Sequence, residues 1–252
     1  MIREAGDPDG PVLFMLHGWG YDSLATWHRT IEPLADHFRL VLMDQRNHGG
    51  TARVRGSFSV DDLADDAAGV IDALELGPVT VVGYSMGGMV AQALTRRYPG
   101  KVTRLVLGAT AALPISDRRL AARAVFALGR AIGRLSLLEW ARGMHRYLLA
   151  NKAVDREHSR WLWETLLDRD VTLSFETGAA VWHFDSRSWV SGLTVPALIV
   201  IPTADQLVAP RSQRELAQLL PNSEVVELVG AKHEAVMTHG DELAKAIIEF
   251  AG

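Results

Sequence analysis

The sequence predicts an α/β fold in which a mostly parallel sheet carries helices on both faces. Short apolar runs alternate with helix-length segments in both outer parts of the chain, and this alternation is typical of parallel sheets. Between those parts the composition changes: none of the 10 prolines lies between Pro114 and Pro196, whereas five of the 7 tryptophans do. We therefore expect an α/β core of residues 1–112 and 191–252, interrupted by an all-helical cap at 113–190.

The pattern of apolar residues places the elements of the core. Apolar or β-branched runs bounded by turn residues predict strands; these runs cover residues 12–16, 39–43, 79–82, 104–109, 195–201 and 224–229. Apolar residues at helical spacing predict helices over residues 27–38, 60–74, 90–98, 211–220 and 241–250. We expect the first of these helices to break near Pro33, and the second to have Ser59 as its N-cap with Asp61 and Asp62 in its first turn.

The bulk composition excludes several classes of function. The 252 residues carry a net charge of −4 with acidic and basic residues interspersed, so nothing predicts binding to nucleic acid. The absence of cysteine excludes disulfides and thiolate chemistry. No apolar signal region and no apolar run of membrane-spanning length is present. We therefore expect a soluble, cytoplasmic protein with no stable membrane insertion, and no motif requires a metal or a cofactor.

One stretch organises the chain: a predicted buried strand leads into Gly83-Tyr84-Ser85-Met86-Gly87, and a predicted helix follows. Gly83 and Gly87 flank Ser85 in the spacing of a nucleophile elbow, where a sharp turn needs small residues on either side of a strained serine. Such a turn raises the serine above the strand end, beside a helix N-terminus that favours negative charge. The alternative is a glycine-rich loop that happens to contain serine, but the strand before and the helix after favour a nucleophile.

Asp205 and His233 each come just after a different predicted strand. Because parallel strands end at one edge of a sheet, both side chains can converge there with Ser85. A serine hydroxyl needs a neighbouring base, and a carboxylate orients that base; the order Ser, Asp, His along the chain is the one reported for this architecture. Asp185 in the insertion is a rival for the acid. The histidines on predicted helices or their flanks are better suited to structural or surface roles: His28, His37, His145, His158, His183 and His239.

The loops after the first two strands carry further candidates. Cleavage of an ester creates an oxyanion, which needs preorganised N–H donors. We expect the backbone N–H groups of Trp19 and Met86 to supply them. His17 is expected to hydrogen-bond the loop that places Trp19 rather than to act in catalysis, and Asp44 is expected to brace its own loop through an ion pair with Arg46.

The inserted segment is expected to cover Ser85 and enclose a mostly apolar pocket. Most of its tryptophans should pack its helices onto the sheet, whereas Trp19, Tyr84, Trp140 and Trp182 are our candidates for substrate contacts. Over residues 119–135 an apolar stripe and arginines on a different face predict one amphipathic helix. A solvated basic face is favoured there over a lid that seeks a membrane surface.

Together these motifs resemble the α/β-hydrolase superfamily over nearly the whole chain. The matching stretches are His17-Gly18-Trp19, residues 44–49, residues 83–88, Asp205 and His233. The resemblance implies the α/β-hydrolase fold and its catalytic triad. Within the superfamily the chain is most similar to cofactor-free esterases, enol-lactone hydrolases and serine-type perhydrolases, whereas Ser85 disfavours relatives with an aspartate nucleophile.

Three departures from the family pattern have structural consequences. Asn47 stands where the family usually has glycine, and asparagine tolerates positive φ well. Only residues 2–6 could supply part of the two antiparallel strands with which the family usually begins, so a second copy of the chain could cover the sheet edge in a homodimer. Thr238 and His239 stand where the family commonly has an acidic residue.

These inferences converge on a serine hydrolase that cleaves a small-molecule carboxylic ester or lactone through an acyl-enzyme. The sequence also leaves other functions open. A perhydrolase or acyltransferase would pass the same acyl group to peroxide or an alcohol, and the same triad can serve hydrolysis of a carbon–carbon bond. A ligand-binding, receptor-like module could retain the triad and use closure of the cap as its signal.

Overall fold

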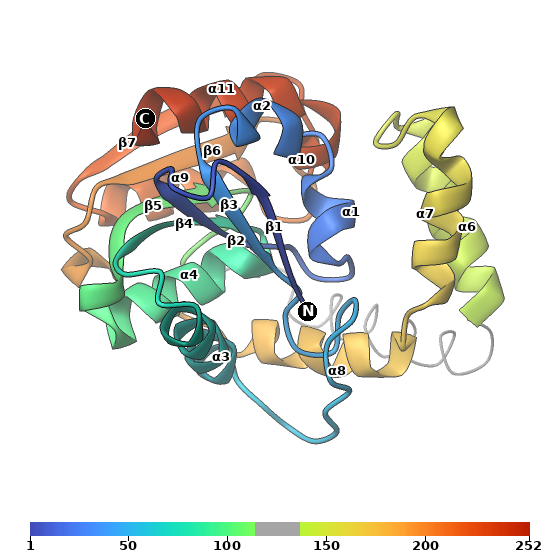
Figure 1. Ribbon diagram of the computed structural model, residues 1–252, viewed down its shortest axis with the longest axis horizontal. Coiled ribbons are helices and arrows are strands. Elements are labelled where there is room, and N and C mark those ends of the chain that lie inside the picture. The colour runs from blue at the N-terminus through green and yellow to red at the C-terminus, as the bar shows by residue number, and fades with distance from the viewer. Residues whose placement is uncertain (114–136) are drawn as a thin grey trace.

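The computed structural model describes residues 1–113 and 137–252, and for residues 171–172 and 174–176 it describes the backbone only. The helix predicted over residues 119–135 lies outside the described residues. In the described chain a central sheet lies between two layers of helices, and a pair of further helices stands to one side (Figure 1).

The sheet has seven strands in the order β1-β3-β2-β4-β5-β6-β7. They are β1 (Ile2–Gly6), β2 (Val12–Leu16), β3 (Arg39–Met43), β4 (Val79–Tyr84), β5 (Val102–Gly108), β6 (Ala197–Pro202) and β7 (Ser223–Leu228). β1 pairs antiparallel with β3, and the other pairs are parallel, which confirms the predicted mostly parallel sheet. β1 supplies the antiparallel edge strand, and the homodimer that would cover it stays a prediction.

Helices cover both faces of the sheet, as predicted. One layer contains α3 (Val60–Ala73), α4 (Met86–Arg97) and α9 (Pro210–Leu219), and the other contains α1 (Ser23–Trp27), α2 (Ile31–Ala35), α10 (Ala235–Thr238) and α11 (Gly240–Ala251). Neighbouring residues of a strand point to opposite faces, so Leu13 and Phe14 of β2 belong to two different apolar clusters although both are fully buried. Burial of both faces explains why the strands read as continuous apolar runs.

The first helical region differs from its prediction. The chain forms α1 and α2 in place of one helix, and the interruption falls at residues 28–30, not at Pro33. Pro33 lies in the first turn of α2, where a missing N–H costs no hydrogen bond. By contrast, Ser59 is the N-cap of α3 as predicted, and Asp62 completes a capping box with it.

Three α-helices lie between β5 and β6 in the described part of the insertion: α6 (Leu137–Ala150), α7 (Ser159–Leu167) and α8 (Val171–Trp182). Short 3-10 helices occur at Pro99–Lys101, Arg156–His158 and Val190–Gly192. Figure 1 shows α6 and α7 side by side, next to the core. Among the described residues, no helix combines the length and the apolar character needed to cross a membrane.

The strand register brings the loops of interest to one edge of the sheet. Leu16 at the end of β2 lies opposite Gly83 of β4, and Tyr84 lies opposite Gly108 of β5. The loop that carries Trp19 therefore starts beside the turn that follows β4. β6 and β7 run parallel to these strands and end at the same edge.

Candidate active site

The turn between β4 and α4 has the geometry of a nucleophile elbow. Ser85 has φ 53° and ψ −115°, a strained conformation for a residue with a side chain. A Cβ at Gly83 would clash with the backbone of Gly87, and one at Gly87 would clash with the carbonyl oxygen of Leu16. The backbone N–H of Ser85 donates to the Gly108 carbonyl at 2.8 Å. Only glycine therefore fits two residues before and two residues after this serine.

The three side chains expected to converge do lie together. The distance between Ser85 Oγ and His233 Nε2 is 3.0 Å, and His233 Nδ1 lies 2.8 Å from Asp205 Oδ2. A neutral imidazole that donates from Nδ1 to the carboxylate leaves Nε2 as an acceptor for the serine hydroxyl. The arrangement can therefore take a proton from Ser85.

Asp205 is held in place by the turn that follows β6. Its Oδ1 accepts backbone N–H groups from Leu207 at 2.8 Å and Val208 at 2.9 Å. Its Oδ2 accepts from Gln213 Nε2 at 3.1 Å in addition to the imidazole. The rival Asp185 is exposed and pairs with Arg187 at 2.7 Å. The carboxylate beside His233 is thus the one from the core.

The loop after β2 runs beside Ser85. A Cβ added to Gly18 would lie 3.4 Å from the Ser85 Cβ. His17 is buried and supports this loop as predicted. Its Nδ1 donates to the Gly18 carbonyl at 2.8 Å, and its Nε2 accepts the Gln45 N–H at 2.8 Å. The Gln45 amide donates in turn to the His17 carbonyl at 2.6 Å.

A second buried histidine, His48 in the loop after β3, supports the same segment. Its Nε2 accepts the N–H of Gly20 at 3.2 Å, and its Nδ1 donates to the Arg46 carbonyl at 3.0 Å. In the sequence, His48 stands out only as part of the motif at residues 44–49. Asn47 beside it has φ 65°, so asparagine does occupy a positive-φ position here.

The predicted ion pair between Asp44 and Arg46 is wrong. Asp44 pairs with Arg3 of β1 at 2.7 Å, and Arg46 pairs with Asp66 of α3 at 2.7 Å. Neither partner could be predicted from the sequence, since both come from distant segments. Burial raises the pKa of Asp44, but hydrogen bonds from Ser23 outweigh this and lower the pKa to about 2.

Tyr84, expected to contact substrate, is instead buried below His233. Its hydroxyl donates to the His233 carbonyl at 2.8 Å and accepts the Val236 N–H at 3.3 Å. Burial raises the pKa of Tyr84 well above its ordinary value, which keeps the hydroxyl protonated as a donor. The structure therefore corrects the expectation: Tyr84 positions the loop of His233.

The tryptophans proposed for the pocket are all half-buried. Trp19 packs against the apolar cluster that includes α4, and Trp140 of α6 packs against the cluster on the opposite face. Trp182 ends α8. Their contact with substrate stays a prediction, as do the oxyanion roles of the Trp19 and Met86 amides. Met86 opens α4, where an N–H group has no acceptor within the helix.

Two polar side chains near the site were missed in the sequence. Gln213 donates a hydrogen bond to Asp205. It lies three residues before Leu216, so it is a polar residue on the buried face of α9. This position could have indicated a polar role for Gln213. Gln92 of α4 accepts the Ser186 hydroxyl at 2.7 Å. This bond ties α4 to the segment that returns from the insertion to the core.

Among the residues that the structure describes, one group of side chains has the spacing to hold a metal ion. Asp155, Glu157 and His158 come together on the surface before α7, and all three are exposed. Asp155 already pairs with Arg29 of the core at 2.8 Å. An exposed acidic group of this kind does not by itself indicate a metal site.

The model of the alpha/beta hydrolase fold family matches residues 11–240. The chain belongs to this family. A relative of this α/β hydrolase, pimeloyl-[acyl-carrier protein] methyl ester esterase of Yersinia pseudotuberculosis, is 29% identical over 252 residues, which cover 98% of this chain and 94% of that protein. A biotin biosynthesis bifunctional protein of Teredinibacter turnerae is 27% identical over 96% of this chain, and the match spans only 45% of that longer protein.

Among solved structures, the enol-lactonase from Burkholderia xenovorans LB400 superposes with a TM-score of 0.83. It is 25% identical, and the match covers 99% of this chain and 95% of the enol-lactonase. The predicted fold class and the predicted family are both confirmed by these similarities.

Proposed function

We propose that this α/β hydrolase cleaves a carboxylic ester or lactone through an acyl-enzyme, with Ser85, His233 and Asp205 as its catalytic triad. The observation that carries the proposal is the chain of contacts from Ser85 Oγ to His233 Nε2 and from His233 Nδ1 to Asp205 Oδ2, at 3.0 and 2.8 Å. All three side chains follow strands that end at one edge of the sheet, where α/β proteins bind ligands.

In the first half of the proposed reaction, Ser85 Oγ attacks the carbonyl carbon while its proton passes to His233 Nε2. Asp205 stabilises the resulting imidazolium and keeps the ring in one tautomer. The proton then passes to the leaving alkoxide, so that the alcohol departs and the acyl group stays on Ser85. In a lactone the alcohol remains attached to the acyl chain. Water repeats the sequence, giving the acid and free Ser85.

The backbone N–H groups of Trp19 and Met86 are proposed to hold the oxyanion of each tetrahedral intermediate. Such donors act because they already point to the place where negative charge develops. One of them typically stabilises the transition state by about 3–4 kcal/mol. The position of Gly18 next to Ser85 supports this role for the Trp19 loop. The N-terminal position of Met86 in α4 supports the other.

The names of the relatives support the substrate class. One relative is named as a methyl ester esterase and a solved neighbour as an enol-lactonase, and both names describe cleavage at an acyl–oxygen bond. We propose that residues 113–190 serve as a cap over the site, since α6, α7 and α8 all lie between β5 and β6.

Replacement of Ser85 tests the proposal. Ser85→Ala should lower kcat for p-nitrophenyl esters by about 10⁴-fold or more, because the attacking oxygen is lost. The same change should abolish covalent labelling by a fluorophosphonate. Rates are measured on esters of graded chain length beside several lactones, and the label is located by mass spectrometry.

Ser57→Ala, which alters an exposed serine, is the matched control and should keep full activity and labelling. Unchanged turnover or labelling in Ser85→Ala would refute the proposal. Product analysis with water, peroxide and an alcohol present separates hydrolysis from perhydrolysis and acyl transfer.

A further inference from the structure

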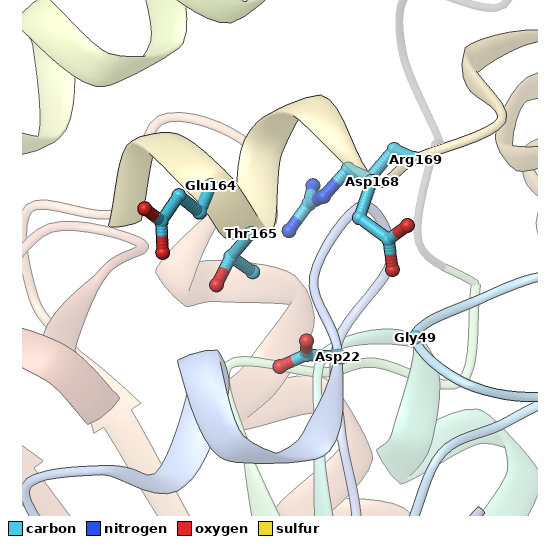
Figure 2. Close-up of a pocket in the computed structure, with 6 residues that line it drawn as sticks. All are labelled: Asp22, Gly49, Glu164, Thr165, Asp168 and Arg169. Atoms are coloured by element: carbon cyan, nitrogen blue, oxygen red, sulfur yellow. The ribbon is translucent and has the colours of Figure 1, made fainter. Parts of the chain in front are cut away.

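Asp205 is a buried carboxylate, and such a group depends on hydrogen-bond donors from the protein. Its side chain is 0% exposed. By contrast, Glu164 and Asp168 are exposed and line a cavity of about 260 Å³ beside α7 (Figure 2). Water can solvate those two carboxylates, whereas Asp205 needs protein groups to stabilise its charge. The donors around Asp205 therefore decide where its two oxygens lie.

Gln213 is one of these donors, and it comes from α9. The residue is fully buried and lies in the first turn of the helix, which begins at Pro210. Its Nε2 is 3.1 Å from Asp205 Oδ2 and 2.8 Å from the carbonyl oxygen of Val208. Because an amide nitrogen carries two hydrogens, Gln213 can donate to both oxygens at once.

The neighbours of Gln213 fix the orientation of its amide. A rotation that exchanged the amide oxygen and nitrogen would place Oε1 against two acceptors, the carboxylate of Asp205 and the carbonyl of Val208. In the orientation that the structure shows, Oε1 is buried and accepts no hydrogen bond from the described residues. An unsatisfied buried acceptor is unfavourable for folding. Stability alone therefore explains this amide poorly.

Gln213 donates to the same carboxylate oxygen that faces the imidazole. Asp205 Oδ2 lies 2.8 Å from His233 Nδ1, whereas Oδ1 accepts the backbone N–H groups of Leu207 and Val208. A carboxylate oxygen has two lone pairs. When the amide of Gln213 occupies one lone pair of Oδ2, the other is left for the imidazole. The amide thus limits the directions from which Asp205 can meet the ring.

The donors to Asp205 differ in what they are attached to. The backbone N–H groups belong to the turn that carries Asp205 itself, so they move with it. Gln213 lies on α9, and Leu216 of the same helix is fully buried in the apolar cluster that includes α4. Among the described residues, Gln213 is therefore the donor that anchors the carboxylate to a packed helix.

We propose that Gln213 is a positioning residue of the candidate triad, which fixes Asp205 Oδ2 in line with His233 Nδ1 and so speeds proton transfer from Ser85. This inference rests on the proposed function. Gln213 acts through Asp205 and not through contact with substrate. A displacement of about 1 Å in such a constellation can slow catalysis roughly 100-fold. The effect of Gln213 should therefore fall on kcat and leave KM almost unchanged.

Removal of the Gln213 donors is the direct test. Gln213→Met keeps the length of the side chain and should lower kcat for p-nitrophenyl esters by about 10- to 100-fold, with KM within about threefold. The rate of fluorophosphonate labelling of Ser85 should fall by a similar factor. Gln218→Met makes the same chemical change at an exposed position of α9 and should keep the wild-type values. Wild-type kcat in folded Gln213→Met would overturn the proposal.

A double-mutant cycle separates action through Asp205 from a general effect on the fold. In an Asp205→Ala background, Gln213→Met should change the labelling rate of Ser85 by less than about twofold, because no carboxylate is left to orient. The Tm of each variant, measured alongside, ensures that the rates compare folded proteins. Equal fold losses with and without the Asp205 carboxylate would show that Gln213 does not act through it.

Nuclear magnetic resonance tests the intact side chain and does not depend on the folding of a Gln213 variant. Labelling of Ser85 removes the hydroxyl that faces His233, and the change passes along the hydrogen bonds to Asp205. The side-chain amide signals of Gln213 should shift on labelling, and those of Gln218 should not. Unshifted Gln213 signals would contradict the proposal. Absence of ester turnover and labelling in the wild type would refute the proposed function itself, which the other outcomes leave standing.

Discussion

His17 and His48, the two buried histidines beside the candidate site, are bonded in a way that requires neutral rings. Each accepts a backbone N–H at Nε2, which a protonated imidazole cannot do. The two ring centres are only 4.9 Å apart. Burial lowers the pKa of His17, and burial is also the main cause that lowers the pKa of His48 well below its ordinary value. Both rings therefore hold the loop of Trp19 only while they are unprotonated.

The protein should therefore lose stability as the pH falls below about 6.5, the pKa of histidine in an unfolded chain. Below that pH the unfolded chain binds protons at His17 and His48 while the folded chain does not, so acid favours unfolding. One such histidine changes the free energy of unfolding by up to about 1.4 kcal/mol per pH unit. His48→Gln should reduce this slope, as measured by urea unfolding between pH 7 and pH 5.

His37→Gln is the matched control, because His37 is exposed and its ring is not part of the buried pair. It should leave the slope of stability against pH unchanged. A slope in His48→Gln equal to that of the wild type would show that His48 does not stay neutral in the fold.

At the scale of the element, the elbow depends on two close backbone approaches. Gly83 faces the backbone of Gly87, and Gly87 faces the Leu16 carbonyl at the end of β2. The strained serine is thus held by packing of α4 against the ends of two strands. Gly88 is similarly confined by Thr110, so small residues are needed where the first turn of α4 meets the strand ends.

Gly87→Ala should destabilise the protein by more than about 3 kcal/mol, because its Cβ overlaps a backbone oxygen that cannot move without shifting β2. The contrasting variant is Gly69→Ala in α3, where a Cβ meets open space. That change should stabilise by about 0.5–1 kcal/mol through helix propensity. Urea unfolding measures both, and equal effects of the two substitutions would contradict the steric explanation of the elbow.

At the scale of the whole molecule, the described inserted helices and the core are joined by several polar contacts. Tyr147 of α6 donates to Glu234, next to His233, at 2.8 Å. Lys232, on the other side of His233, donates to Asn151 at 3.0 Å. Both contacts are exposed, and exposed polar contacts contribute little to stability. We therefore expect α6 and α7 to open more readily than the sheet.

Native-state amide exchange should show α6 and α7 opening with a smaller free energy than β2, β4 and β5. Tyr147→Phe should lower that opening free energy by a further ~0.5–1 kcal/mol, the usual value of one hydrogen bond. Tyr98→Phe removes a matched bond to Asp65 inside the core and should leave exchange in α6 and α7 unchanged. Opening of α6 together with the strands would contradict this expectation.

The strands, most helices and the elbow could be predicted because their signals are local. Continuous apolar runs, the glycines around Ser85 and the cap at Ser59 each report the conformation of their own segment. The candidate triad could also be predicted, because parallel strands all end at one edge and so unite Ser85, Asp205 and His233. Those predictions needed only the order of the elements along the chain.

Side-chain partners could not be predicted in the same way, since they depend on which segments the fold brings into contact. Asp44 binds Arg3 rather than its neighbour Arg46, and Tyr84 reaches the loop of His233 rather than substrate. The guanidinium of Arg169 lies 4.7 Å from the ring centre of Tyr21, a contact between segments that are far apart in the sequence. The local sequence pattern was enough to predict the helices and strands and the catalytic candidates at the strand ends. This is because hydrophobic periodicity and backbone sterics act over a few residues. Partners and cavities required the folded chain, because burial and charge pairing act between residues that are distant in sequence.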